Sequence, residues 1–216
     1  LVLRRQRQMC IRDRIISADK GLCGGFNGSV ARLAKHEMNR LETEGKSVKV
    51  YFVGRKAADA LGSAISDRTF ARVEGVQGTN LGFESASEIA SKIITGFEEG
   101  QFDAVSLIFN RFVNAITQEV THTSLIPVQI DAPEDEGSES AIFYDYEPEE
   151  AEILSALLPR NMSTQIFSAL LESSAAELAA RMTAMDNATR NAGDMIDRLT
   201  LVSVSYTHLR AHETKR

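Results

Sequence analysis

The sequence predicts an α/β protein made of a parallel-rich sheet domain and a long C-terminal helix. Two observations predict the sheet domain: strand and helix patterns alternate from residue 15 to about residue 109, and the apolar runs have the length of buried strands. A third observation predicts the long helix. Apolar residues recur at helical spacing over 160–201, and Gly193 is the one helix breaker in that stretch.

Composition limits the partners of the chain. Of its 216 residues, 43% are apolar and 25% are charged, which is sufficient for a sizeable core. The net charge of −6 argues against nucleic acid as a main partner, because phosphate binding requires a basic surface. Two cysteines, Cys10 and Cys23, fit a reducing compartment. No apolar run approaches the roughly 20 residues that span a bilayer, so membrane association is expected through partners.

The first predicted elements are a strand, a glycine-rich turn and a helix. Ile15–Ser17 is typical of the end of a strand, and the turn DKGLCGGFNGS follows at 19–29. Ser29 is a candidate N-cap for a helix that ends at Gly45. At least one glycine of the turn is expected to have a positive φ angle. The structural glycines of the turn are Gly21, Gly24 and Gly25, and the apolar positions of the helix are Val30, Leu33, Ala34, Met38 and Leu41.

The following elements continue the alternation. Val48–Val53 predicts a buried strand, and a short helix is expected over about 55–62. A glycine-punctuated loop reaches Gly82. Ser85–Phe97 is amphipathic, and Val105–Phe109 predicts a second buried strand. The apolar face of the amphipathic helix contains Ile89, Ile93 and Phe97.

The chain then leaves this pattern. Ala115–Val120 and Leu125–Ile130 alternate like two strands, 131–140 is predicted to be an exposed loop, and Ile142–Tyr144 is predicted to be a last short strand. Residues 131–150 hold nine acids and no base. Because these acids lack regular ligand spacing, a solvated loop is favoured over a metal site.

The C-terminal third predicts one long helical region. Pro148 fits the first turn of a helix, and the negative charges of Glu149 and Glu150 interact favourably with the positive end of the helix dipole. Pro159 is expected to break or restart the helix. The remainder, 160–201, would be about 60 Å long at 1.5 Å per residue.

The apolar stripe of this helix predicts a coiled-coil seam, since its steps are mostly three, four or seven residues. Small and flexible side chains in the stripe allow close helix approach with loosely specified packing. Such a helix requires a partner helix. The seam residues are Met162, Ile166, Leu170, Leu178, Met182, Met185, Ala188, Ala192, Met195 and Leu199.

Sequence motifs for chemistry are weak. The phosphate-loop pattern and GxGxxG are absent, and the GxxGG of the turn favours a tight strand-to-helix connection over phosphate binding. No set of Ser, His and Asp or of Cys and His is recognisable around His36 or His122. Cys23 could be a low-pKa thiol at a helix start, although a small residue packed in a turn is the favoured interpretation. No catalytic, cofactor-binding or metal-ligating residue is therefore predicted.

Three segments resemble ATP synthase gamma subunits, most closely those of alphaproteobacteria. DKGLCGGFN at 19–27 is similar to a hallmark segment of that family. LLPRNMSTQIFSALLES at 157–173 and ARMTAMDNATRNAGDMIDRLTL at 180–201 are similar to the start and body of its C-terminal helix. The resemblance covers about residues 15–201 in the family's order. It implies a Rossmann-like sheet domain and a long helix that belongs to an antiparallel coiled coil.

The resemblance also implies a function. Gamma subunits are the non-catalytic rotor stalk that couples proton-driven rotation of the c ring to ATP synthesis in the beta subunits. The implied partners are the alpha, beta and epsilon subunits and the c ring, with membrane contact only through the complex, at the cytoplasmic face of the bacterial inner membrane. No cofactor is implied. Polar residues of the long helix that could contact stationary subunits, or could simply be solvated, are Arg181, Asp186, Asn187, Arg190, Asn191, Asp194 and Arg198.

Both ends depart from the family. Residues 1–14, which hold five Arg and one Asp, stand where the family has a long N-terminal helix and most of the first strand. After Leu201, VSVSYTHLRAHETKR does not continue the heptads. Both ends resemble translated junction sequence, and the alternative is genuine divergent ends, such as a targeting arm at 1–14. The expected division is a non-native segment at 1–14, the sheet domain at 15–147, the coiled-coil helix at 148–201 and a non-native tail at 202–216.

Two other functions are open from the residues alone. One is a doubly wound enzyme domain that binds a nucleotide at the 19–29 turn. A phosphate-loop Lys or an acid after the second strand would support it, but Gly54 and Arg55 follow that strand. The other is a coiled-coil interaction protein without rotary function, which accounts for 160–201 but not for the glycine-rich turn.

Overall fold

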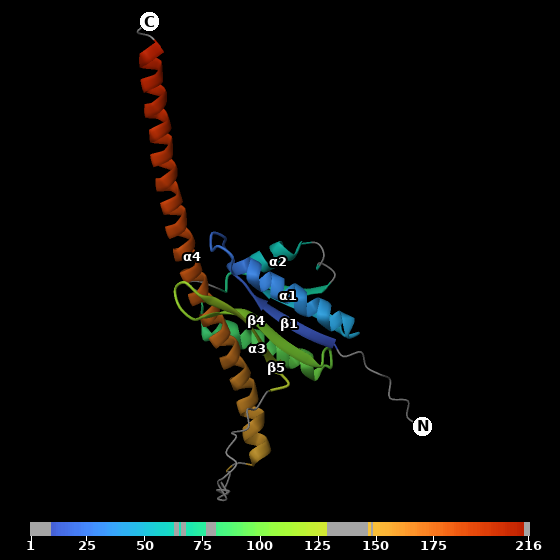
Figure 1. Cartoon of the computed structure of the whole chain (residues 1–216). Coiled ribbons are helices and arrows are strands. Elements are labelled where there is room, and N and C mark those ends of the chain that lie inside the picture. Colours follow the sequence, from blue (N-terminus) through green and yellow to red (C-terminus); the bar gives the residue numbers. More distant parts are fainter. Residues whose placement is uncertain are drawn as a thin grey trace, which may run out of the picture.

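The structure is a computed structural model that describes residues 10–62, 65, 68–76, 81–128, 147 and 149–213. It consists of a sheet covered by helices and one long helix that runs past the sheet and far beyond it (Figure 1). This is the predicted class of fold, a parallel-rich sheet domain with a long C-terminal helix.

The sheet has the strand order β3-β2-β1-β4-β5. The strands β1, β2, β3 and β4 run parallel, and β5 is antiparallel to β4. Their central members are rich in buried β-branched and aromatic residues, as expected for strands covered on both faces. The bounds are Cys10–Ile16 for β1, Ser47–Val53 for β2, Thr69–Val73 for β3, Ala104–Phe112 for β4 and Gln118–Ile126 for β5.

The helices cover the two faces of the sheet. α1 (Phe26–Thr43) and α2 (Lys56–Leu61) pack on one face, in a core that includes Ile15, Phe52 and Ile108. α3 (Phe83–Glu98) and the first half of α4 (Glu150–Glu213) pack on the other face. The order β1-α1-β2 and β3-α3-β4 therefore gives the two-layered covering that parallel strands require.

The N-terminal elements are longer than predicted. β1 begins at Cys10, so the expectation that most of the first strand is missing before Ile15 is wrong: Cys10 pairs with β2, and 11–14 pair with both β2 and β4. α1 begins at Phe26 with Gly25 as its N-cap. Ser29 is not the N-cap, because it lies within the first turns and its hydroxyl donates to the Phe26 carbonyl at 2.8 Å.

The edges of the sheet were predicted less well. The sequence predicts a loop over 69–73, whereas these residues form β3. Where two strands were predicted, at 115–120 and 125–130, the described residues form one strand, β5, over Gln118–Ile126, preceded by a turn. The predicted loop at 131–140 and the predicted strand at 142–144 lie outside the described residues.

α4 is continuous through Pro159, so the predicted break there is wrong. Because proline has no N–H, the carbonyl of Ser155 loses its donor within the helix. Ser155 is exposed, so water can donate to this carbonyl instead. Directly after the proline, Met162 and Ile166 pack against the sheet domain and stabilise the helix. The helix also includes 202–213, beyond the point where the heptad pattern was expected to end.

Candidate functional site

The carboxyl ends of β1 and β4 meet where the strand order changes direction. β1 continues into α1 on one face of the sheet, whereas β4 is reached from α3 on the other face. In open α/β sheets, ligands bind beyond the carboxyl ends of strands at such a switch point. The loop 17–25, which carries the glycine-rich turn, borders this position. It is therefore the first place to test for a nucleotide site.

α4 fills this position. Ala176 and Ala180 pack against Ala18, Cys23 and Phe26 in a small buried cluster. The helix continues along the turn, and the Cβ of Ala184 lies 3.9 Å from where a Cβ on Gly24 would stand. A shallow hollow of ≈ 330 Å³ remains beside Arg32 and Asn110. The occupied crevice favours the structural interpretation of the glycine-rich turn, because the turn forms a seat for the helix.

Backbone geometry explains the glycines of the turn only in part. Gly24 has φ +55, which fulfils the expectation that at least one glycine has a positive φ, whereas Gly21 and Gly25 do not. Leu22 also has a positive φ, of 63°, and its side chain is exposed. Asn27 holds the turn, since its Oδ1 accepts from the Ala18 N–H at 3.0 Å and its Nδ2 donates to the Cys23 Sγ at 3.1 Å.

Cys23 is not a low-pKa thiol. Burial raises the pKa of its thiol, and the nearby carboxylate of Glu177 raises it further, against a smaller opposing effect of Arg181. The thiol therefore remains protonated at neutral pH and acts as a small packed residue. The acid at this point also disfavours an anionic ligand at the start of α1.

The long helix presents two different apolar faces. Its first half buries a sheet-facing side, in which Ile166 and Leu170 are almost inaccessible to solvent. A second side, which we call the outer stripe, is exposed and follows heptad steps of seven, four and three residues. The outer stripe consists of Leu171, Leu178, Met182, Met185, Ala192, Ile196 and Leu199.

The predicted seam combined these two faces. Ile166 and Leu170 are buried in the core of the sheet domain, and Met162 packs against this core while partly buried. These three residues face the sheet, and their role in a seam stays a prediction. The step of eight residues from Leu170 to Leu178 turns the stripe by about 80° around the helix. Leu178, Met182, Met185, Ala188, Ala192, Met195 and Leu199 are all exposed, and their role in a seam stays a prediction. Leu171 and Ile196 complete the heptads and had been missed.

The polar residues proposed as contacts lie in the same half of α4. Arg181 pairs with Glu177, and Arg190 pairs with Asp186, one helical turn away in each case. Asp194 and Arg198 are exposed, as are Asn187 and Asn191. From Met185 to Ala211 every described side chain is exposed.

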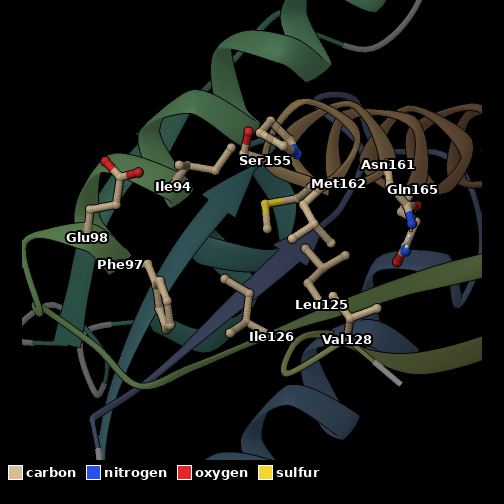
Figure 2. Close-up of a pocket in the computed structure, with 12 residues that line it drawn as sticks. Ile94, Phe97, Glu98, Leu125, Ile126, Val128, Ser155, Asn161, Met162 and Gln165 are labelled. Atoms are coloured by element: carbon tan, nitrogen blue, oxygen red, sulfur yellow. Dashed lines mark hydrogen bonds between the residues drawn. The ribbon is translucent and has the colours of Figure 1, made fainter. Parts of the chain in front are cut away.

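An apolar groove of ≈ 400 Å³ lies between α3, β5 and the first turns of α4 (Figure 2). Ile94 and Phe97 of α3, Leu125 and Ile126 of β5, and Met162 of α4 converge on it. Among its described lining residues Glu98 is the one ionisable group. The groove can hold an apolar group but offers no set of residues for acid–base chemistry.

Candidate catalytic and metal sites are not formed in the described part of the chain. His36 and His122 are both exposed, on α1 and β5. Among the described residues, no group of three His, Cys, Asp or Glu side chains could hold a metal ion. A search of the described helices finds none that is both long and apolar enough to span a membrane. The distinctive surface is therefore the exposed half of α4 with its outer stripe.

Comparisons of sequence agree on one family. A family model described as ATP synthase matches residues 6–206. A protein of Parvibaculum lavamentivorans named ATP synthase gamma chain is 47% identical over 190 residues, which cover 87% of this chain and 64% of that protein. The ATP synthase gamma chain of Methylobacterium nodulans is 46% identical over 188 residues, with the same coverage of 87% and 64%. The chain thus spans 64% of the length of these curated relatives.

Solved structures give the same result for the fold. A chain in the cryo-EM structure of the Tetrahymena thermophila mitochondrial ATP synthase, central stalk and c ring, matches with a TM-score of 0.64 and 29% identity, covering 84% of this chain and 77% of that chain. A chain of the Euglena gracilis mitochondrial ATP synthase rotor has the same TM-score of 0.64 at 18% identity, covering 95% and 74%, and shows likeness of fold.

Proposed function

The chain belongs to the ATP synthase family, among relatives named ATP synthase gamma chain, and from this membership we propose that it supplies the central rotor stalk of an F-type ATP synthase. In this role it couples proton-driven rotation of the c ring to ATP synthesis at catalytic sites in the beta subunits. The stalk itself carries out no chemistry. The proposed location is the cytoplasmic face of the bacterial inner membrane, reached through the complex.

One observation carries the proposal from the structure: the outer stripe continues along α4 well beyond the sheet domain. Most helical stability in proteins comes from packing of an apolar face, and apolar burial against a partner helix is the main force that could hold this part of α4. Leu178, Met182 and Met185 are exposed on it. We propose that an antiparallel helix packs on the outer stripe, and that the pair enters the ring of alpha and beta subunits.

The sheet domain has the complementary role at the base. It is broad, whereas the exposed half of α4 is a single slender helix, so it can offer a wide surface to the epsilon subunit and the c ring (Figure 1). The exposed charges Asp194 and Arg198, together with the paired Arg181, Asp186 and Arg190, supply transient polar contacts with the stationary subunits. Charged contacts of this kind are weak in water and release readily.

A chimaera tests this function. Residues 15–201 replace the matching segment of a complete alphaproteobacterial gamma chain, and ATP-driven proton pumping is measured in inverted membrane vesicles. We expect assembly and pumping near the level of the host enzyme. A matched chimaera with Met182→Asp and Met185→Asp should lose pumping while the sheet domain still folds. Assembly without any pumping by the first chimaera would contradict the stalk function.

A titration separates the stalk from the rival enzyme. The crevice at the end of β1 is filled by Ala176 and Ala180, so we expect no heat of binding when Mg-ATP, ADP or NAD is added at millimolar concentration. Micromolar, magnesium-dependent binding that is abolished by Gly24→Val would favour a nucleotide-binding domain.

A further inference from the structure

Two loops of the sheet domain contact α4 just before the exposed half of the helix begins. The turn between β4 and β5 lies against the helix on one side (Figure 1). The loop 17–25 lies against a neighbouring side. Both loops contact the same stretch of helix, from Glu172 to Ala184. We call these two loops together the clasp.

The last residue of β4 and the β4–β5 turn each make one directional contact with the helix. The Phe112 N–H donates to the Glu172 carboxylate at 2.9 Å, and the Thr183 hydroxyl lies 3.0 Å from the carbonyl of Ala115, which accepts from it. Glu172 and Thr183 are eleven residues apart, which is three helical turns and about 20° of rotation. The turn therefore braces one side of the helix at two points about 16 Å apart along its axis.

The loop 17–25 adds close contact without polar bonds. Ala176 and Ala180 pack on it, and Ala184 continues this row of small residues toward Gly24. Such side chains let the loop approach the helix backbone closely. The Asn110 Nδ2 donates to the Phe26 carbonyl at 3.2 Å, which joins the end of β4 to the start of α1. This bond links the strand that leads into the β4–β5 turn to the first residue of the helix that follows the loop 17–25.

The clasp is the last contact before the exposed half of α4, which begins at Met185. A twist applied to that half reaches the sheet domain through the contacts that α4 makes before Met185. The closely packed core holds the first half of α4, and the hydrogen bonds of Glu172 and Thr183 add directional contacts at the end of this packed stretch. We infer that the clasp locks the rotation of α4 relative to the sheet domain, with Glu172 and Thr183 as its positioning residues. This inference rests on the proposed stalk function.

Two substitutions and one matched control test the clasp in the complete chain. Thr183→Val removes the hydroxyl at nearly constant shape, and Glu172→Met removes the acceptor. The control is Thr189→Val. The Thr189 hydroxyl donates to the Met185 carbonyl at 2.9 Å, and the Thr183 hydroxyl donates to the Ala179 carbonyl at 3.1 Å, so both threonines make the same bond within the helix. Only Thr183 reaches the β4–β5 turn as well.

Amide hydrogen exchange measured by NMR is the first readout. Glu172→Met should speed exchange of the Phe112 amide roughly tenfold, and Thr183→Val should speed the Asn114 amide of the same turn several-fold. Core amides such as Ile15 and Ile108, and the unfolding midpoint, should stay near the parent. Glu172→Gln, which keeps an acceptor oxygen, should restore slow exchange at Phe112. Equal acceleration of all sheet amides, or no change in the turn, would overturn the clasp.

The second readout is mechanical and separates the clasp from the stalk function. In the chimaeric enzyme, the outer end of α4 is held and the angular fluctuation of a bead on the sheet domain is recorded. Thr183→Val combined with Glu172→Met should widen that fluctuation, whereas Thr189→Val should not. An unchanged width in a pumping enzyme would overturn the clasp alone. A chimaera that does not pump would contradict the stalk function, while the exchange results would still decide the clasp.

Discussion

The carbonyl oxygen of Ser17 lies 1.9 Å from the position that a Cβ atom would take on Gly54. Ser17 follows β1 and Gly54 follows β2, so the two parallel strands touch at their carboxyl ends. The Ser17 N–H donates to the Val53 carbonyl at 2.8 Å, and the Ser17 Oγ accepts from the Ala57 N–H at 3.1 Å. The Gly54 N–H donates to the Val73 carbonyl at 2.8 Å. This contact joins the ends of three strands to the start of α2.

Gly54→Ala should destabilise the sheet domain by about 3 kcal/mol or more, because the new methyl group overlaps backbone and Gly54 has φ +95. Denaturation with urea measures the loss. Gly100→Ala is the matched control: it shares a positive φ, +65, but a Cβ there meets nothing within 4 Å. That variant should lose about 1 kcal/mol. Similar losses for both variants would show that the close approach to Ser17 is unimportant.

The glycines of the 19–29 turn should differ from one another. Gly24 has φ +55, so Gly24→Ala should destabilise the domain by about 1 kcal/mol through backbone strain. Gly25 has φ −80 and open space around it, so Gly25→Ala should change the free energy of unfolding by less than about 0.5 kcal/mol. Thermal unfolding followed by circular dichroism distinguishes the two. A parent-like midpoint for Gly24→Ala would contradict the role of its positive φ.

The sequence predicted the centre of the sheet better than its edges, for a physical reason. β2 and β4 are covered on both faces and therefore appear as apolar runs. β3 lies at an edge, and its residues Phe70 and Arg72 face solvent, so no run of buried residues marks it. β5 is the other edge, and its polar centre at 121–124 divided it into two apparent strands.

The interaction surface of α4 was partly predictable. Apolar spacing identified a long helix with exposed apolar residues, but spacing alone does not tell which of two adjacent faces packs on the sheet. The contact between Glu172 and the Phe112 amide left no signal, because Glu is common on any exposed helix and the two residues are 60 positions apart. The resemblance of 19–27 and of 157–201 to gamma subunits, in contrast, agrees with the relatives found.

Asp13 predicts a pH-dependent stability. Its carboxyl group is buried on the central strand β1, where one oxygen accepts from the Ser106 hydroxyl and the other has no partner among the described residues. Burial raises its pKa above the ordinary 3.8, against a smaller lowering by Ser106. The folded state therefore binds this proton more tightly than the unfolded state. The resulting stability is complete below pH 3.8 and is lost as pH rises through the folded pKa.

Asp13→Asn measures this effect, since asparagine keeps the shape and a hydrogen bond to Ser106 without the charge. We expect the variant to become more stable relative to the parent, with a larger free energy of unfolding, as pH rises from about 4, and this difference should then level off. Urea titrations at a series of pH values follow the difference. A flat profile for Asp13→Asn would contradict the raised pKa.

The two apolar faces of α4 should respond differently to the same substitution. Leu170 is 0% exposed and Leu178 is 61% exposed, although both are leucines of one helix. Leu170→Ala should destabilise the sheet domain by about 3 kcal/mol through the cavity that it leaves. Leu178→Ala should change stability by less than about 0.5 kcal/mol. Equal losses in chemical denaturation would mean that the outer stripe also packs on the domain.

The outer stripe should make the chain as given self-associate, because an exposed apolar strip of this length is unstable in water. Met182→Asp together with Met185→Asp places two charges in the middle of the stripe, at side chains that make no core contact with the sheet. We expect sedimentation equilibrium to show that this pair shifts the chain toward monomer, while the thermal midpoint of the sheet domain stays within a few degrees.

The control for this pair adds the same charge elsewhere on the same helix. Asn187→Asp and Asn191→Asp lie more than about 100° away from the centre of the stripe, so they raise the net negative charge equally without interrupting apolar contact. If general repulsion caused the dissociation, both pairs would act alike. If the stripe causes it, only the methionine pair will. A parent chain that is already monomeric, with amides of 185–201 slow to exchange, would mean that the exposed half of α4 is stable without a partner, and the proposed helix pairing would then have no basis.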